Sequence, residues 1–157
     1  MKKDLKNFVP LIIIFSIICI VTGIKQYCIP NNFNSCMADF MGAFFIVFGC
    51  FKIINLSGFA YAYAMYDIIA KRSMFYAMSY PFIELFLGVA YLLHYHFVNW
   101  ITLPLMLINS IGVSQKLFSH EQIECACLGA VFKIPMTYVT LAEDLLMAFM
   151  ALIMLFY

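Results

Sequence analysis

Long apolar runs separated by short polar segments dominate this sequence. The pattern predicts helices over residues 8–25, 38–57, 76–95, 98–117 and 137–157. An apolar helix of roughly 20 residues is long enough to cross the hydrocarbon core of a bilayer. We therefore expect an all-α membrane protein whose chain crosses the bilayer five times.

The polar breaks between the runs differ in kind. Residues 58–72 are rich in alanine and tyrosine and end in basic residues, which favours a short interfacial helix with Tyr61, Tyr63 and Tyr66 at headgroup depth. The longest polar segment, residues 118–135, is predicted to be a loop that carries two cysteines. No segment is long enough for a separate soluble domain, so residues 1–157 are expected to form a single integral membrane domain.

The first apolar run follows a basic segment, as in both signal peptides and membrane anchors. The run from Phe8 to Ile24 is at the long end for a signal peptide, and no clear cleavage pattern of small residues precedes Lys25. We therefore favour an uncleaved first helix.

Basic residues orient the predicted helices, because cytoplasmic loops carry an excess of lysine and arginine. With a cytoplasmic N-terminus, seven basic residues fall on the cytoplasmic side and one, Lys25, falls on the other. The count predicts a multi-pass protein of the bacterial inner membrane. The loop with Cys28 and Cys36 is then external, and the loop with Cys125 and Cys127 is cytoplasmic.

Composition supports the membrane assignment and excludes several functions. The chain is 66% hydrophobic and 11% charged with a mean hydropathy of +0.97, whereas soluble domains are about half apolar and a quarter charged. The lipid bilayer is the expected surrounding, and with a formal net charge of +1 no nucleic acid partner is expected. No nucleophile-base-acid set or phosphate-binding glycine loop is present, which argues against a hydrolase or NTPase.

Cys125 and Cys127 carry the sharpest chemical signal. Two thiols one residue apart can bind one soft metal ion together but form at best a strained disulfide, which favours metal binding over redox chemistry. Chance occurrence in a chain with six cysteines is the alternative. Cys28 and Cys36 flank the short external loop, where a structural disulfide and a working thiol pair fit the sequence equally well.

Eleven methionines extend the supply of soft ligands, since thioethers prefer Cu(I) among biological cations. Met37 and Met41 share one face of the second predicted helix, next to Cys36, and are candidate metal ligands with the four loop cysteines. Met147, Met150 and Met154 form a stripe on the last helix. Flexible packing is the more common role of such stripes.

Four ionisable residues lie inside predicted membrane helices, where an unpaired charge is costly: Lys52, Glu84, Glu143 and Asp144. In an antiparallel pair of helices, Lys52 and Glu84 lie at the same depth and can form an ion pair. Glu143 and Asp144 lie one or two turns inside the last predicted helix, at the same depth. A structural clasp and a path for protons or cations explain this polar cluster equally well.

Several short motifs resemble the MauE/DoxX family of membrane proteins. They are Met41-Gly42-x5-Phe48-Gly49-x2-Lys52-x5-Gly58-Phe59, Tyr66-Asp67, Tyr80-Pro81-Phe82-Ile83-Glu84-Leu85-x2-Gly88, and a tail with Cys125-x-Cys127 and Val139-Thr140-Leu141-x-Glu143-Asp144. The resemblance implies a DoxX-like four-helix transmembrane bundle, here with one extra N-terminal transmembrane helix. Family members are described as redox-associated, in disulfide formation or maturation of a periplasmic amine dehydrogenase subunit, and others look like partners of heavy-metal handling systems.

Three functions therefore stay open. The first is transport or binding of a soft metal ion, Cu(I) or Hg(II), with Cu(I) the preferred ion and a metallochaperone as partner. The second is an enzyme-like thiol-disulfide oxidoreductase that works through Cys28, Cys36, Cys125 and Cys127 with a quinone or a periplasmic redox partner. The third is an accessory scaffold for a membrane complex. Each is compatible with a homo-oligomer.

Overall fold

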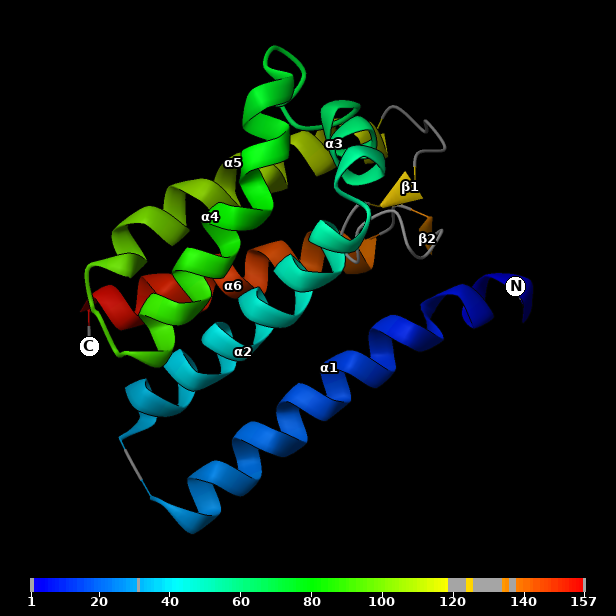
Figure 1. The fold of residues 1–157 in the computed structure, drawn as a ribbon. Coiled ribbons are helices and arrows are strands. Elements are labelled where there is room, and N and C mark those ends of the chain that lie inside the picture. Colours follow the sequence, from blue (N-terminus) through cyan, green and yellow to red (C-terminus); the bar gives the residue numbers. More distant parts are fainter. Residues whose placement is uncertain (1, 31, 119–123, 126–133, 136–137, 157) are drawn as a thin grey trace.

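The fold is built from α-helices that pack as a bundle with one helix beside it (Figure 1). The computed structural model describes residues 2–30, 32–118, 124–125, 134–135 and 138–156, with side chains over 9–30, 32–118 and 141–156. In chain order the elements are α1 (Lys2–Cys28), α2 (Phe33–Ile54), α3 (Leu56–Ala64), α4 (Met74–Leu92), α5 (Val98–Phe118), β1 (Glu124–Cys125), β2 (Ile134–Pro135) and α6 (Tyr138–Phe156). The two short strands pair antiparallel.

The predicted all-α membrane fold is confirmed, with α2, α4, α5 and α6 as the bundle and α1 as the extra helix. Four segments within the described residues are long and apolar enough to cross a membrane: Val9–Cys28, Phe33–Ile54, Met74–Leu92 and Val98–Phe118. The fifth predicted span corresponds to α6. The short helix expected after the second span is α3.

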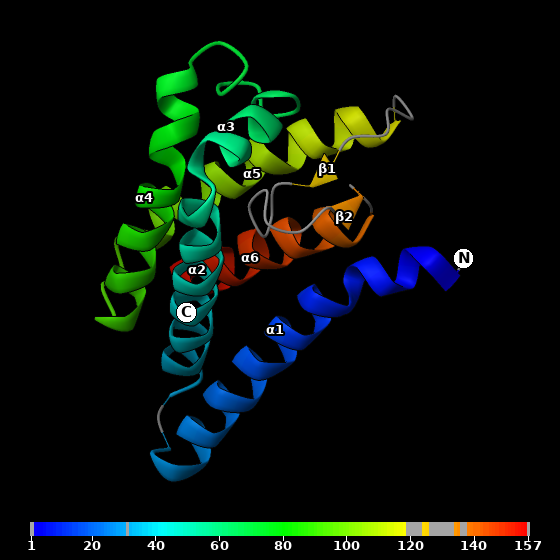
Figure 2. The same cartoon turned by 45° about the vertical axis from the view of Figure 1, so that its right-hand side comes forward.

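The four bundle helices pack as two main pairs. α2 packs mainly on α4, α5 packs mainly on α6, and α3 covers the start of α4. α1 contacts the bundle chiefly through α2 and stands apart from α4 and α5 in both views (Figure 2). One end of the bundle holds α3, β1, β2 and the start of α1, and we call it the α3 end. The opposite end holds the α1–α2 and α4–α5 connections and the end of α6.

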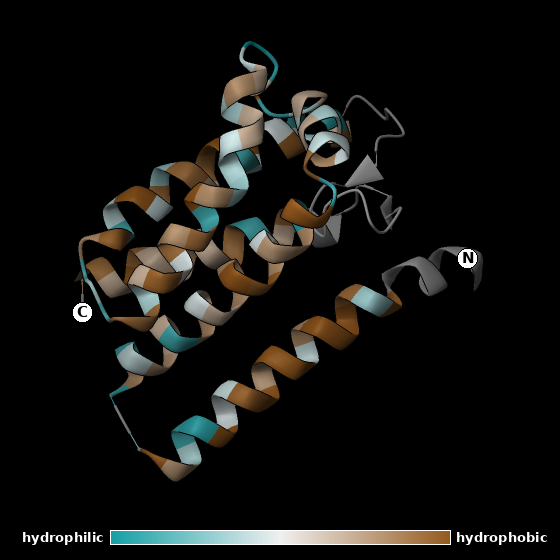
Figure 3. Cartoon of the chain, in the orientation of Figure 1, coloured by the Kyte–Doolittle hydropathy of each residue, from teal (hydrophilic) through white to brown (hydrophobic). Residues whose placement is uncertain are grey.

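A few polar groups are buried within the apolar core of the bundle, and apolar side chains also cover its outside. Asp39, Lys52, Asp67, Glu84 and Asn109 are buried, whereas isoleucine, leucine and phenylalanine side chains cover the outer faces of the long helices. Figure 3 shows this apolar covering along α1. Long helices whose outer faces are so largely apolar suit a lipid surrounding, which agrees with the span lengths.

Glycines allow α2 and α4 to approach closely. A Cβ atom at Gly88 would lie 2.7 Å from Ile46 Cγ1 and 3.1 Å from the carbonyl oxygen of Gly42. Small residues at helix contacts are the common means of close packing in membranes, where no hydrophobic force draws helices together. A similar contact fixes the α3 end, since a Cβ at Gly112 of α5 would lie 2.6 Å from the carbonyl oxygen of Tyr66.

We predict that Gly88→Ala destabilises the protein, because the added methyl group overlaps Ile46 and the α2 backbone. Overpacking of this kind costs about 1–3 kcal/mol. Gly23→Ala is the matched control, since nothing lies within 4 Å of a Cβ there. Thermal unfolding in detergent should show a lower midpoint for Gly88→Ala only. Equal midpoints for the two variants would contradict the close packing of α2 on α4.

Candidate functional site

A buried ion pair joins α2 to α4 near the α3 end. Lys52 lies in the last turn of α2, and its Nζ is 2.5 Å from Oε1 of Glu84 in α4. Only 7% of Lys52 and 3% of Glu84 is exposed. The contact that the antiparallel arrangement predicts is therefore present. Because both charges are out of water, each depends on the other for neutralisation.

Two aromatic rings complete the surroundings of the lysine. Its Nζ lies 5.5 Å from the ring centroid of Phe59 and 5.1 Å from that of Tyr80. A cation is attracted to the face of an aromatic ring at such distances. Phe59 comes from α3 and Tyr80 from α4, so the lysine draws three helices together.

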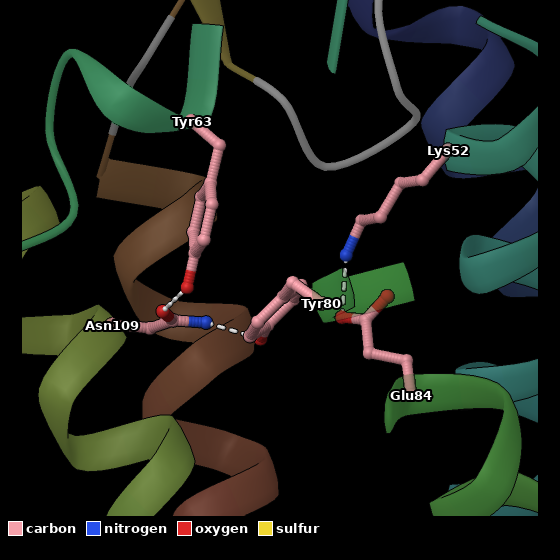
Figure 4. A network of polar contacts seen from close by, with 5 residues as sticks. All are labelled: Lys52, Tyr63, Tyr80, Glu84 and Asn109. Atoms are coloured by element: carbon pink, nitrogen blue, oxygen red, sulfur yellow. Dashed lines mark hydrogen bonds and ion pairs between the residues drawn. The ribbon is translucent and has the colours of Figure 1, made fainter. Parts of the chain in front are cut away.

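A chain of hydrogen bonds continues from these rings into α5 (Figure 4). Tyr63 Oη donates to Asn109 Oδ1 at 2.8 Å, and Asn109 Nδ2 donates to Tyr80 Oη at 2.5 Å. Burial raises the pKa of Tyr63, so its hydroxyl stays protonated and able to donate. Of the three tyrosines expected at headgroup depth, Tyr63 and Tyr66 are packed against the protein, with 1% and 9% exposed, whereas Tyr61 is 67% exposed.

The four ionisable residues predicted inside the membrane line one cavity of about 30 Å³. Lys52 enters from α2, Glu84 from α4, and Glu143 and Asp144 from α6. A water molecule needs about 10–15 Å³ of such space, so the cavity has room for one or two waters. The remaining lining consists of seven aromatic side chains, one methionine and one amide: Phe44, Phe45, Phe48, Phe59, Tyr63, Tyr66, Tyr80, Met106 and Asn109.

Charge in this cavity is unbalanced. Three carboxyl groups face one lysine, and the lysine is paired with Glu84. Oε2 of Glu84 is buried and has no hydrogen-bond partner among the described residues. An ionised carboxylate without partners is costly in a dry interior. The cavity therefore favours the binding of a proton or another cation, which would neutralise the excess negative charge.

A second charged cluster lies at the opposite end of the bundle. Asp39 of α2 is 5% exposed, and its Oδ1 lies 2.5 Å from Lys25 Nζ and 3.8 Å from His94 Nε2. His94 has a φ of 56°, in the left-handed region. The sequence prediction omitted Asp39, although it lies one residue inside the second predicted span and was therefore detectable. A cavity of about 50 Å³ nearby is lined by Asn34, Ser35, Ala38, Tyr91, His94, Tyr95, His96 and Met154.

Sulfur side chains line a groove between α1, α2 and α6. The groove has a volume of about 400 Å³, and its sulfur-bearing residues are Cys19, Cys36, Met37 and Met150. Cys28 is exposed at the end of α1, and Cys28 and Cys36 are both free thiols. Met41, the other predicted ligand on α2, is fully buried in the core.

The second predicted thiol pair lies partly outside the described residues. Cys125 belongs to β1, which contacts α3, but its side chain and all of Cys127 fall outside them. Cys28 ends α1 and Cys36 lies in the first turn of α2. Figure 1 shows the α1–α2 connection at the end of the bundle away from β1. Within the described ranges, no three His, Cys, Asp or Glu side chains are grouped to hold a metal ion.

Fold and site together define a polytopic helical membrane protein with an ionic cavity inside its bundle. Residues 30–157 match the family model of methylamine utilisation protein MauE. The chain therefore belongs to the MauE family. The match starts after α1, so the family region corresponds to the four-helix bundle with α3. Neither the curated proteins nor the solved structures contain a significant match to this chain.

We predict that Lys52→Ala reduces the yield of folded protein in detergent, because it leaves Glu84 buried without its partner. Breaking a buried pair costs about 3–5 kcal/mol. Lys71→Ala is the control, since Lys71 is an exposed lysine outside the cavity. Lys52→Met combined with Glu84→Met should recover much of the yield. An unchanged yield for Lys52→Ala would contradict a stabilising role of the pair.

Proposed function

We propose that this MauE family protein transfers a soft metal ion, with Cu(I) preferred and Hg(II) as the other candidate, across the inner membrane of a bacterium. The observation that carries the proposal is the groove between α1, α2 and α6, which is lined by two cysteines and two methionines. Thiolates and thioethers are the ligands that Cu(I) prefers. The N-terminus is cytoplasmic in this proposal, as the distribution of basic residues indicates.

The order of ligands along the bundle supports a route. Cys28 and Cys36 receive the ion at the external end, and Met37 continues the sulfur lining one residue further along α2. Cys125 and Cys127 then take the ion on the side where β1 lies. A metallochaperone that exchanges the ion with these thiols is the partner of matching chemistry. Transfer between thiol pairs on opposite sides of a membrane needs intermediate ligands, and the sulfur groove supplies them.

A thiol-disulfide role is the second candidate, and the free, exposed thiol of Cys28 favours it. In that role Cys28 and Cys36 exchange with a periplasmic thiol protein, and a quinone takes up the electrons. Direct exchange between the two thiol pairs of one chain is disfavoured, because the start of α2, which carries Cys36, lies at the end of the bundle away from β1 (Figure 1). Metal transfer does not require the two pairs to meet.

We predict that reconstituted protein binds Cu(I) and that Cys36→Ser and Met37→Leu each weaken the affinity at least several-fold. The expected cause is the loss of one soft ligand from the groove. Cys50→Ser is the matched control, because Cys50 is an exposed thiol on the same helix outside the groove. Competition with a colourimetric Cu(I) chelator measures the affinity. Equal affinity in all three variants and the parent would end the metal proposal.

We also predict that Cys125 and Cys127 are labelled by a membrane-impermeant thiol reagent only after the cells are opened. The experiment uses a chain in which Cys19, Cys28, Cys36 and Cys50 are all replaced by serine. A second chain that retains only Cys28 serves as the control and should be labelled in intact cells. Labelling of Cys125 and Cys127 from outside would contradict the transfer route and favour the thiol-disulfide role.

A further inference from the structure

We propose that the ionic cavity is a proton-binding site, in which Glu143 and Asp144 of α6 hold exchangeable protons. Nothing in the metal proposal requires this site, so the inference goes beyond the proposed function. It follows from the charge, the volume and the lining of the cavity.

The cavity contains more acidic groups than basic ones. Lys52 is 2.5 Å from Glu84 Oε1, so its charge serves that carboxylate. Glu143 and Asp144 line the same cavity and have no ion pair among the described residues. Two further negative charges beside a nearly buried ion pair would be opposed by desolvation and by mutual repulsion. Protons remove both penalties without any change in packing.

The size of the cavity favours a proton over a larger cation. Its volume of about 30 Å³ has room for one or two waters, and the ammonium of Lys52 already projects into it. A metal cation such as Na⁺ would need several oxygen ligands around it, whereas a carboxyl group needs no such shell to take up a proton. One water molecule in the cavity can donate to Glu84 Oε2, which is buried and has no hydrogen-bond partner among the described residues.

The titratable and polar side chains around the cavity come from all the helices that line it. α2 contributes Lys52, α4 contributes Glu84 and Tyr80, and α3 with the turn after it contributes Tyr63 and Tyr66. α5 contributes the amide of Asn109, which is already bonded to two tyrosines. Lys52 is therefore the only cation among the described residues that line the cavity.

The two acidic residues of α6 differ in the spaces that they line. Glu143 lines the cavity and also a groove of about 310 Å³ beside α1, together with Leu146 one turn later. Asp144 shares its helix face with Met147, which is 1% exposed and packed in the core. Both acidic residues are half-buried, and Glu143 lines the cavity and the groove, whereas Asp144 lines the cavity but not that groove. This arrangement allows a proton to enter through Glu143 and pass to Asp144.

The test is infrared spectroscopy of the protein in lipid nanodiscs, where a protonated carboxyl group gives a C=O band distinct from a carboxylate. Ordinary acidic side chains are ionised at about pH 7, so a band there reports protonated carboxyl groups. We expect the band in the parent protein, a loss of about half of its intensity in Glu143→Gln and in Asp144→Asn, and its absence in the double variant. Asp39→Asn is the matched control and should keep the full band, because Asp39 is buried and ion-paired at the opposite end.

Three results would overturn the proposal. They are a parent protein without the band at about pH 7, a band that survives in the double variant, and a band that disappears when Na⁺ is added, which would assign the cavity to a metal cation. Lys133, outside the described residues, is tested by Lys133→Gln. That variant should leave the band unchanged, and a new or larger band would show that this lysine neutralises the carboxylates instead. The measurement uses no copper, so its outcome is independent of Cu(I) transfer.

Discussion

The burial of one positive charge is the constraint on which the bundle depends. Lys52 has to find partners away from water, and it finds Glu84 on α4 and the rings of Phe59 and Tyr80. These contacts join the last turn of α2 to Phe59 of α3 and to the middle of α4. An unpaired charge is costly in lipid, so the lysine favours the arrangement in which these three helices meet.

Backbone approach makes this arrangement possible. Gly42 and Gly88 bring α2 and α4 close enough for the lysine and the glutamate to reach each other. Gly112 does the same between α5 and the turn that follows α3, and the hydrogen bond from Tyr63 to Asn109 spans the same contact. The polar network is thus held by helix contacts on both of its sides. A larger residue at any of these positions would separate groups that need to touch.

Sequence reasoning predicted the helices and the ionic centre well, because both follow from strong local rules. Apolar length gave the membrane helices, and the cost of charge in lipid singled out Lys52, Glu84, Glu143 and Asp144. Sequence reasoning did not find the contacts of Tyr63 and Asp39, whose partners lie far away along the chain. Tyr63 was placed at the interface because tyrosine is common there, but its hydroxyl has a partner on α5 that only the tertiary fold supplies. Asp39 was overlooked because its partners come from α1 and from the connection after α4.

α1 packs loosely on the bundle, but it changes the surroundings of the sulfur side chains on α2 and α6. The family region starts at residue 30, so the sulfur-bearing faces of α2 and α6 belong to the part shared with the family, and α1 lies outside it. In a bundle without this helix, Cys36, Met37 and Met150 would lie against acyl chains. The added helix covers them and contributes Cys19 and Thr22 to the same lining. A surface that would otherwise face only lipid thereby becomes one wall of an open groove, and the core of the bundle stays unchanged.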